Sequence, residues 1–120
     1  MKKPFVHDAE LHLDARADIH APGAAITTAL CGSWQHEGPC PLAPHHTYAV
    51  RRASDLAVRV VFATEPESES LVRSIIVDAL AGGELVGPDG QLSSWRLLRN
   101  SAGVLAVEDG PLAARLAQGG

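Results

Sequence analysis

A strand runs directly into a helix in the stretch Val58-Arg-Val-Val-Phe-Ala-Thr-Glu-Pro-Glu-Ser-Glu-Ser-Leu-Val-Arg-Ser-Ile-Ile-Val-Asp-Ala-Leu-Ala-Gly-Gly83. Val58, Val60 and Phe62 recur at every second position, a period that is typical of a strand. Thr64 and Glu67 then fit a capping box, and Gly82-Gly83 fits the end of a helix. Between them, one apolar stripe follows helical spacing: Leu71, Val72, Ile75, Ile76, Ala79 and Leu80.

Further extended segments lie on both sides of this unit. Residues 9–19 alternate strictly, which predicts a strand with one buried face. Residues 24–33 continue as a second strand after an Ala21-Pro22-Gly23 turn, so the two form a hairpin. Residues 47–63 are extended, and 53–55 could be a bulge in one long strand or, as we favour, a turn between two strands. The other expected elements are a turn at 87–90, a hairpin of 92–98 and 103–107 around 100–101, and a short helix over 111–117 capped by Asp109.

This order of elements predicts an α+β fold. We expect an antiparallel sheet of about five or six strands, with one main helix packed on one face and a short C-terminal helix, as a two-layer sandwich. Residues 1–120 form one domain in this interpretation, since domains of about 100–150 residues are common. Residues 1–8 precede the clear patterns and could be disordered, and residues 34–46 form a loop rich in cysteine, histidine and proline.

Composition excludes several functional classes. The formal net charge is −4, and no run of Lys or Arg exceeds two residues, so we expect no nucleic-acid partner. No apolar run approaches the roughly 18 residues of a membrane span, and no apolar segment follows Lys2-Lys3 as in a signal peptide. These observations predict a soluble, cytoplasmic protein without a membrane partner. Cysteines in that compartment stay reduced, which favours metal or thiol chemistry over a disulfide.

Both cysteines and three of the six histidines lie within residues 31–46. Thiolate and imidazole are the preferred protein ligands of zinc, and two thiolates would also suit copper(I). The candidate ligands are Cys31, His36, Cys40, His45 and His46. Adjacent residues of an extended chain point to opposite sides, so His45 and His46 are alternatives for the fourth position of a tetrahedral site. The spacing lacks the paired C-x2-C unit of many zinc modules.

The leading functional hypothesis is therefore a small soluble protein that binds a transition metal, most readily zinc, in a structural, sensing or delivery role. The alternative is a metal-free binding or assembly module, a homodimer, because strand edges in so small a unit favour self-association. The third is a thiol-dependent enzyme that uses a Cys/His pair, since a nearby imidazolium activates a thiol. The polar stripe of the first strand could form a ligand surface or add ligands from His12, Asp14, Arg16, Asp18 or His20, but the solvated face of a half-buried sheet is the favoured interpretation.

Overall fold

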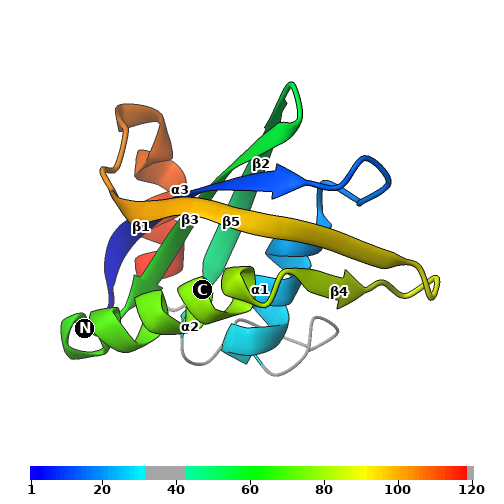
Figure 1. Cartoon of the computed structure of the whole chain (residues 1–120). Coiled ribbons are helices and arrows are strands. Elements are labelled where there is room, and N and C mark those ends of the chain that lie inside the picture. The colour runs from blue at the N-terminus through cyan, green and yellow to red at the C-terminus, as the bar shows by residue number, and fades with distance from the viewer. Residues whose placement is uncertain (32–42, 119–120) are drawn as a thin grey trace.

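The computed structural model describes residues 1–31 and 43–118 and has the expected α+β architecture (Figure 1). Its sheet contains five antiparallel strands, and three α-helices and two short 3-10 turns complete it. The elements in chain order are β1 (Lys3–Leu13), α1 (Ala21–Cys31), β2 (His45–Arg52), β3 (Asp55–Thr64), η1 (Pro66–Ser68), α2 (Glu69–Ala81), β4 (Glu84–Val86), β5 (Leu92–Gly103), η2 (Val107–Asp109) and α3 (Gly110–Ala117).

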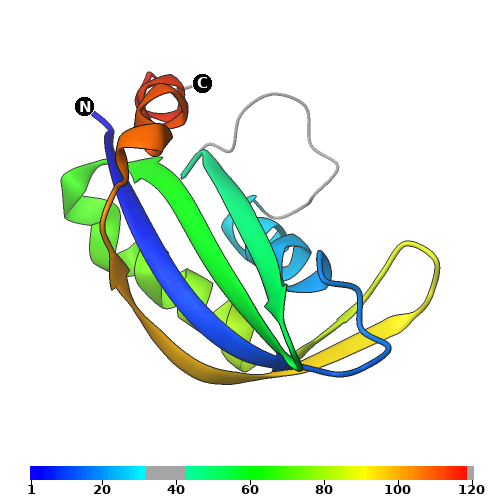
Figure 2. The same cartoon turned by 90° about the horizontal axis from the view of Figure 1, so that it is seen from above.

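The strand order in the sheet is β2-β3-β1-β5-β4. The central strand β1 pairs along nearly its whole length with β3 on one side and with β5 on the other. Apart from the short β4, the order is that of a β-α-β-β-α-β unit, in which each helix connects strands that are not neighbours. The sheet curls strongly, so that it forms half of a barrel (Figure 2). Because β1 begins at Lys3, residues 3–8 belong to the sheet.

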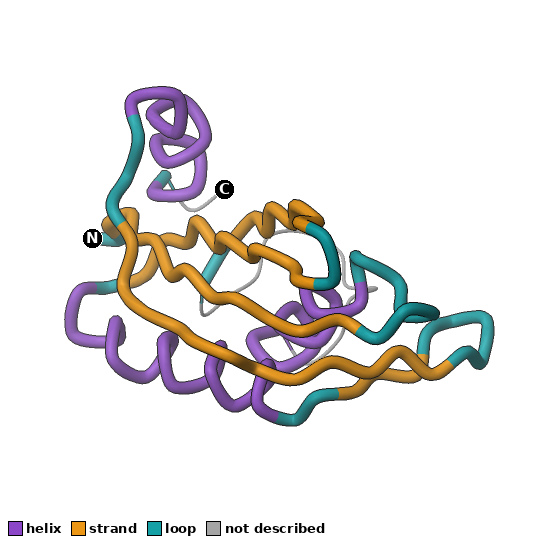
Figure 3. The backbone as a smooth tube through the Cα atoms, turned by 45° about the horizontal axis from the view of Figure 1, so that its top comes forward, coloured by secondary structure: helices purple, strands orange, loops and turns teal. Residues whose placement is uncertain are grey.

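The helices lie on both faces of the sheet (Figure 3). Helices α1 and α2 lie together on one face, whereas α3 packs on the opposite face against β1 and β3. The sequence predicted one main helix on the first face, so the second helix there is a difference. We call the face that carries α3 the outer face, and its side chains alternate with those that point toward α1 and α2.

The main core lies between the sheet and helices α1 and α2. Helix α2 contributes the predicted stripe through Val72, Ile76 and Leu80, whereas Leu71 is exposed. A smaller apolar contact lies under α3, which packs against β1 and β3. Ala113 of the helix is buried there, and Val6, Val61 and Ala63 are buried on the outer face of these strands. The strand residues that fill the main core are Ala9, Leu11, Leu13, Leu56, Val58, Val60, Phe62 and Trp95.

The predicted strand over residues 24–33 is wrong, because Ala21–Cys31 forms helix α1. Ile26 and Leu30 are the buried anchors. They are four residues apart, so they lie on one face of a helix as readily as on one face of a strand. Pro22 belongs to the first turn of the helix, where a missing N–H costs nothing, and not to a turn between two strands. The predicted first hairpin is therefore absent, and β1 ends at Leu13.

Two further local predictions are wrong. β5 runs through Asn100 and Ser101 without a turn, because eight residues of β1 pair with it on both sides of one register shift. The turn at 87–90 joins β4 to β5 instead. Thr64 ends β3 and does not cap a helix; the chain enters α2 through the η1 turn, which has no side-chain cap. The turn between β2 and β3 is confirmed, with Ala53 at a φ of 56°.

Candidate functional site

The predicted ligands surround the connection between α1 and β2. Cys31 is the last residue of α1, and His45 and His46 are the first two residues of β2. His36, Cys40 and the side chain of Cys31 lie outside the described residues. The fold therefore brings the two flanks of the Cys/His-rich segment to the edge of the sheet where β2 lies.

The His45 imidazole has a defined orientation toward α1. Its Nδ1 lies 3.0 Å from the carbonyl oxygen of Ala43, and its Nε2 lies 2.9 Å from Oγ1 of Thr27. A carbonyl only accepts hydrogen bonds, so Nδ1 carries the proton and Nε2 holds a lone pair that accepts from the Thr27 hydroxyl. Histidines that bind metals characteristically donate their second N–H to a backbone carbonyl in this way. The ring thus presents Nε2 toward α1 in the form that a metal requires.

His46 lies on the opposite side of the sheet. It is exposed on the outer face, and its ring meets the edge of Tyr48 with 4.6 Å between the ring centroids. This is the consequence of strand alternation, since His45 and His46 are consecutive residues of β2. The two histidines therefore do not face a common point, and only His45 faces α1.

A hollow of about 260 Å³ opens between the start of α1 and β2. His20, Thr27 and His45 line it together with Thr47, whose buried Oγ1 has no hydrogen-bond partner among residues 1–31 and 43–118. Cys31 follows Thr27 by four residues, so the two positions share one face of α1. Within residues 1–31 and 43–118, however, no group of three or more His, Cys, Asp or Glu side chains is arranged to hold a metal ion. A metal site here needs the donors of residues 31–42.

The polar stripe of the first strand does not form one surface. β1 ends at Leu13, so of these five residues His12 alone belongs to the strand. It lies on the outer face, and its Nδ1 lies 3.5 Å from Oδ1 of Asp55. Only His20 reaches the hollow beside His45. Thr27 is the important partner that sequence reasoning missed. The sequence predicted a strand over residues 24–33, which contains Thr27. A helix over these residues would have placed Thr27 and Cys31 on one face and so indicated that Thr27 lies near the Cys/His-rich segment.

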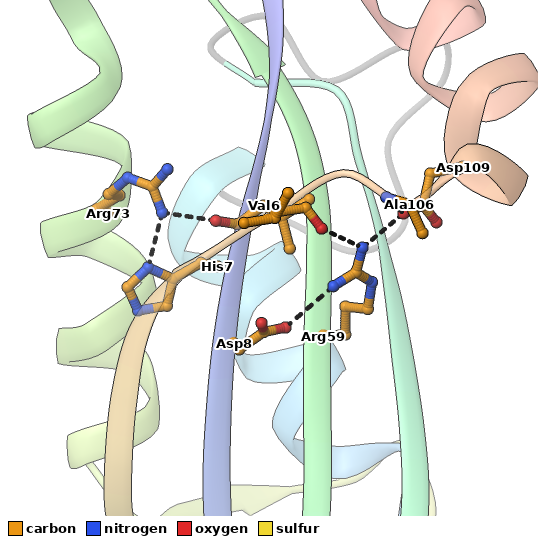
Figure 4. Close-up of polar contacts among 8 residues, drawn as sticks. Val6, His7, Asp8, Arg59, Arg73, Ala106 and Asp109 are labelled. Atoms are coloured by element: carbon orange, nitrogen blue, oxygen red, sulfur yellow. Dashed lines mark hydrogen bonds and ion pairs between the residues drawn. The ribbon is translucent and has the colours of Figure 1, made fainter.

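A second polar cluster fastens α3 to the outer face (Figure 4). Arg59 of β3 contacts Asp8 and donates to the carbonyl of Val104 at 2.9 Å and to the carboxylate of Asp109. Asp109 also accepts from the backbone N–H of Ala106 at 2.8 Å, so it caps the η2 turn and not α3. The Ala106 N–H and then the Arg59 guanidinium lower the pKa of Asp109. This cluster positions the residues that precede α3.

A buried histidine lies on the other face of β1. His7 is only 4% exposed, and its Nδ1 lies 3.0 Å from Nη1 of Arg73, which also donates to the carbonyl of Val6 (Figure 4). The Nε of Arg73 donates to Glu69. Arg73 cannot accept, so Nδ1 holds a lone pair and the ring is neutral. Its Nε2 has no hydrogen-bond partner among the described residues. Burial and then the charge of Arg73 lower the pKa of His7, and Asn100 and Asp8 oppose this shift.

We expect His7 to make the stability of the protein depend on pH. Its pKa is lower in the folded chain than the value of 6.5 for an unperturbed histidine, so the unfolded chain binds the extra proton more readily. The contribution of His7 to the free energy of unfolding should be constant above pH 6.5. It should become less favourable as the pH falls below 6.5, and it should level off once the pH is below the pKa of His7 in the folded chain. Urea denaturation across this range measures the effect.

The matched variant is His7→Asn, whose amide oxygen can accept from Arg73 but does not titrate. It should flatten the decline, whereas His46→Asn, on the exposed outer face, should keep it. An equal decline in the wild type and in His7→Asn would show that another group is responsible.

Comparison with models of protein families, with curated proteins and with solved structures found no match for the chain. Among the described helices, none is both long and apolar enough to span a membrane.

Proposed function

We propose that this protein binds a transition metal, most readily zinc, at the edge of the sheet where α1 ends and β2 begins. The ligands would be Cys31, His36, Cys40 and His45. The observation that carries the proposal is the orientation of His45, whose Nδ1–H is held by the Ala43 carbonyl while Nε2 faces α1. His46 drops out of the ligand set, because it lies on the outer face beside Tyr48.

The donor chemistry supports zinc and leaves copper(I) as the competing ion. Two thiolates and two imidazoles are a common ligand set of closed, tetrahedral zinc sites. With fewer histidines engaged, the same thiolates would favour copper(I). The cytoplasm, which is the location we propose, would keep both cysteines reduced and able to bind.

The metal would take the place of the Thr27 hydroxyl at His45 Nε2. That hydroxyl is a weak partner that can turn to another acceptor, so the exchange does not require the His45 ring to move. The connection from Cys31 to His45 contains Pro39, Pro41 and Pro44, which have no backbone N–H to donate. A metal bound to four side chains would order this segment, which suits a structural role. A metal ion that exchanges with metal ions in solution would instead suit sensing or delivery.

We expect the purified protein, prepared under reducing conditions without chelators and loaded with zinc, to retain about one zinc per chain. His45→Gln should lose most of this zinc, because it removes one of four ligands. His46→Gln should retain it, since the neighbouring ring faces the other side of the sheet. Elemental analysis after desalting measures the metal content of each variant.

Cys31→Ser, Cys40→Ser and His36→Ala should also lose zinc, and cobalt(II) in the wild-type site should show thiolate charge-transfer absorption. Thr27→Val removes the hydroxyl from His45 and should leave zinc bound. Wild-type protein that retains no metal after loading would overturn the proposal. Zinc that survives in Cys40→Ser, or equal loss in the His45 and His46 variants, would overturn this ligand set.

A further inference from the structure

The outer face of the sheet carries a second and larger hollow, of about 430 Å³. Its apolar part comes from Tyr48, Val50 and Ala57, and the first two are 40% and 54% exposed. It also contains both signs of charge, since Asp8 and Glu10 line it with Arg52, Arg59 and Arg99. Helix α3 packs on the same face against β1 and β3, but it leaves Tyr48 and Val50 of β2 exposed.

An exposed apolar segment lies directly beside this hollow. The residues Val104-Leu105-Ala106-Val107 run from the end of β5 into the η2 turn that precedes α3, and we call them the valine segment. Val104 is 81% exposed and Val107 is 93% exposed, and Leu105 is also exposed at 36%. Single exposed apolar residues are ordinary, but three within four positions form a patch of the kind that marks an interaction site.

The valine segment is held in place although its side chains are in solvent. Arg59 donates to the Val104 carbonyl, and Asp109 accepts from the Ala106 N–H. Arg59 also lines the hollow, so one side chain connects the two features. A segment that is ordered before binding loses little conformational entropy when a partner covers it.

We propose that a second copy of this chain docks on the outer face, with the valine segment of each copy in the hollow of the other. A two-fold dimer requires one surface that contains both halves of the contact, and the outer face has the projecting apolar segment and the hollow side by side. The mixed charges of the hollow also suit a second copy. A face of a single sign would repel itself, whereas here Glu10 pairs with Arg99 and Asp8 with Arg59 inside each chain, so two copies can meet without net repulsion.

The test measures the mass of the chain by size-exclusion chromatography with light scattering over a hundredfold range of concentration. The wild type should have the mass of two chains at the higher concentrations. Val50→Glu, in the hollow, and Val107→Lys, in the valine segment, should each shift the mass to one chain. Leu71→Glu is the control, because Leu71 is 55% exposed but lies on α2, on the other side of the sheet. Far-UV circular dichroism identifies any variant that has failed to fold.

Mixing the two monomeric variants distinguishes this arrangement from other contacts on the same face. The Lys introduced at position 107 of one chain would meet the Glu introduced at position 50 of the other, and the second contact of that pair would be native. The mixture should therefore recover the mass of two chains. A wild-type monomer at every concentration, a dimer that only Leu71→Glu disrupts, or a mixture that stays monomeric would each overturn the proposal.

Discussion

Phe62→Ala is expected to lower the free energy of unfolding by about 3–5 kcal/mol, the usual cost of truncating a fully buried phenylalanine. Phe62 is completely buried in β3, and its ring lies against that of Phe5 with 5.6 Å between centroids. The guanidinium of Arg73 lies over the same ring, 5.3 Å from its centroid. The substitution removes apolar contact, leaves a cavity and removes this cation–π contact. Denaturation with urea, followed by far-UV circular dichroism, measures the loss.

Phe62→Leu should cost less than Phe62→Ala, because more of the space stays filled. Leu71→Ala should change stability by no more than about 0.5 kcal/mol, as an exposed substitution. A Phe62→Ala variant with an unchanged denaturation midpoint would contradict the packing of α2 on the sheet. Phe62 is also the register partner of His45. The variant should therefore weaken metal binding as well, through the loss of a rigid support for β2.

Trp95→Ala is expected to have an effect of similar size, about 3–5 kcal/mol. Trp95 is 6% exposed, and its Nε1 donates to the carbonyl of Leu80 at 2.8 Å. Leu80 lies in the last turn of α2, whose final carbonyls have no partner within the helix. The indole therefore fills the core and also satisfies the end of the helix.

Trp95→Phe separates these two contributions. It keeps most of the apolar ring but leaves the Leu80 carbonyl buried without a donor, which should cost about 1–3 kcal/mol. Urea denaturation of both variants gives the two values. Equal losses for the Phe and Ala substitutions would assign the whole effect to the hydrogen bond. A Trp95→Phe variant as stable as the wild type would mean that the hydrogen bond contributes nothing.

The sequence predicted helix α2 because its long apolar stripe, followed by two glycines, has only one interpretation. The turn after Arg52 was the favoured of two alternatives, and the pairing of β2 with β3 decides it against a bulge in one long strand. Helix α1 was missed because the spacing of Ile26 and Leu30 fits both a helix and a strand. The continuous β5 was missed because Asn100 and Ser101 resemble a turn, and only the length of the pairing with β1 overrides that local preference.

The candidate site shows the same division. The sequence identified the Cys/His-rich segment and the alternation that separates His45 from His46. It did not predict the hydrogen bond of His45 to Thr27, because that contact joins residues eighteen positions apart and depends on the helical conformation of α1. The sequence also did not predict the outer-face hollow or the exposed valine segment, because both depend on how much of the sheet α3 covers.

By itself, the sequence determined the α+β class, the position of the main helix and the residues that could bind a metal. These features depend on local periodicity and on side-chain chemistry, which are properties of neighbouring residues. Only the tertiary structure decided the strand order, the conformation of residues 21–31, the face on which each histidine lies and the surface that remains open. Those features depend on which distant segments pack together and bury apolar surface. The free energy of that burial comes from pairs of elements far apart in the sequence, and local sequence does not specify which elements pair.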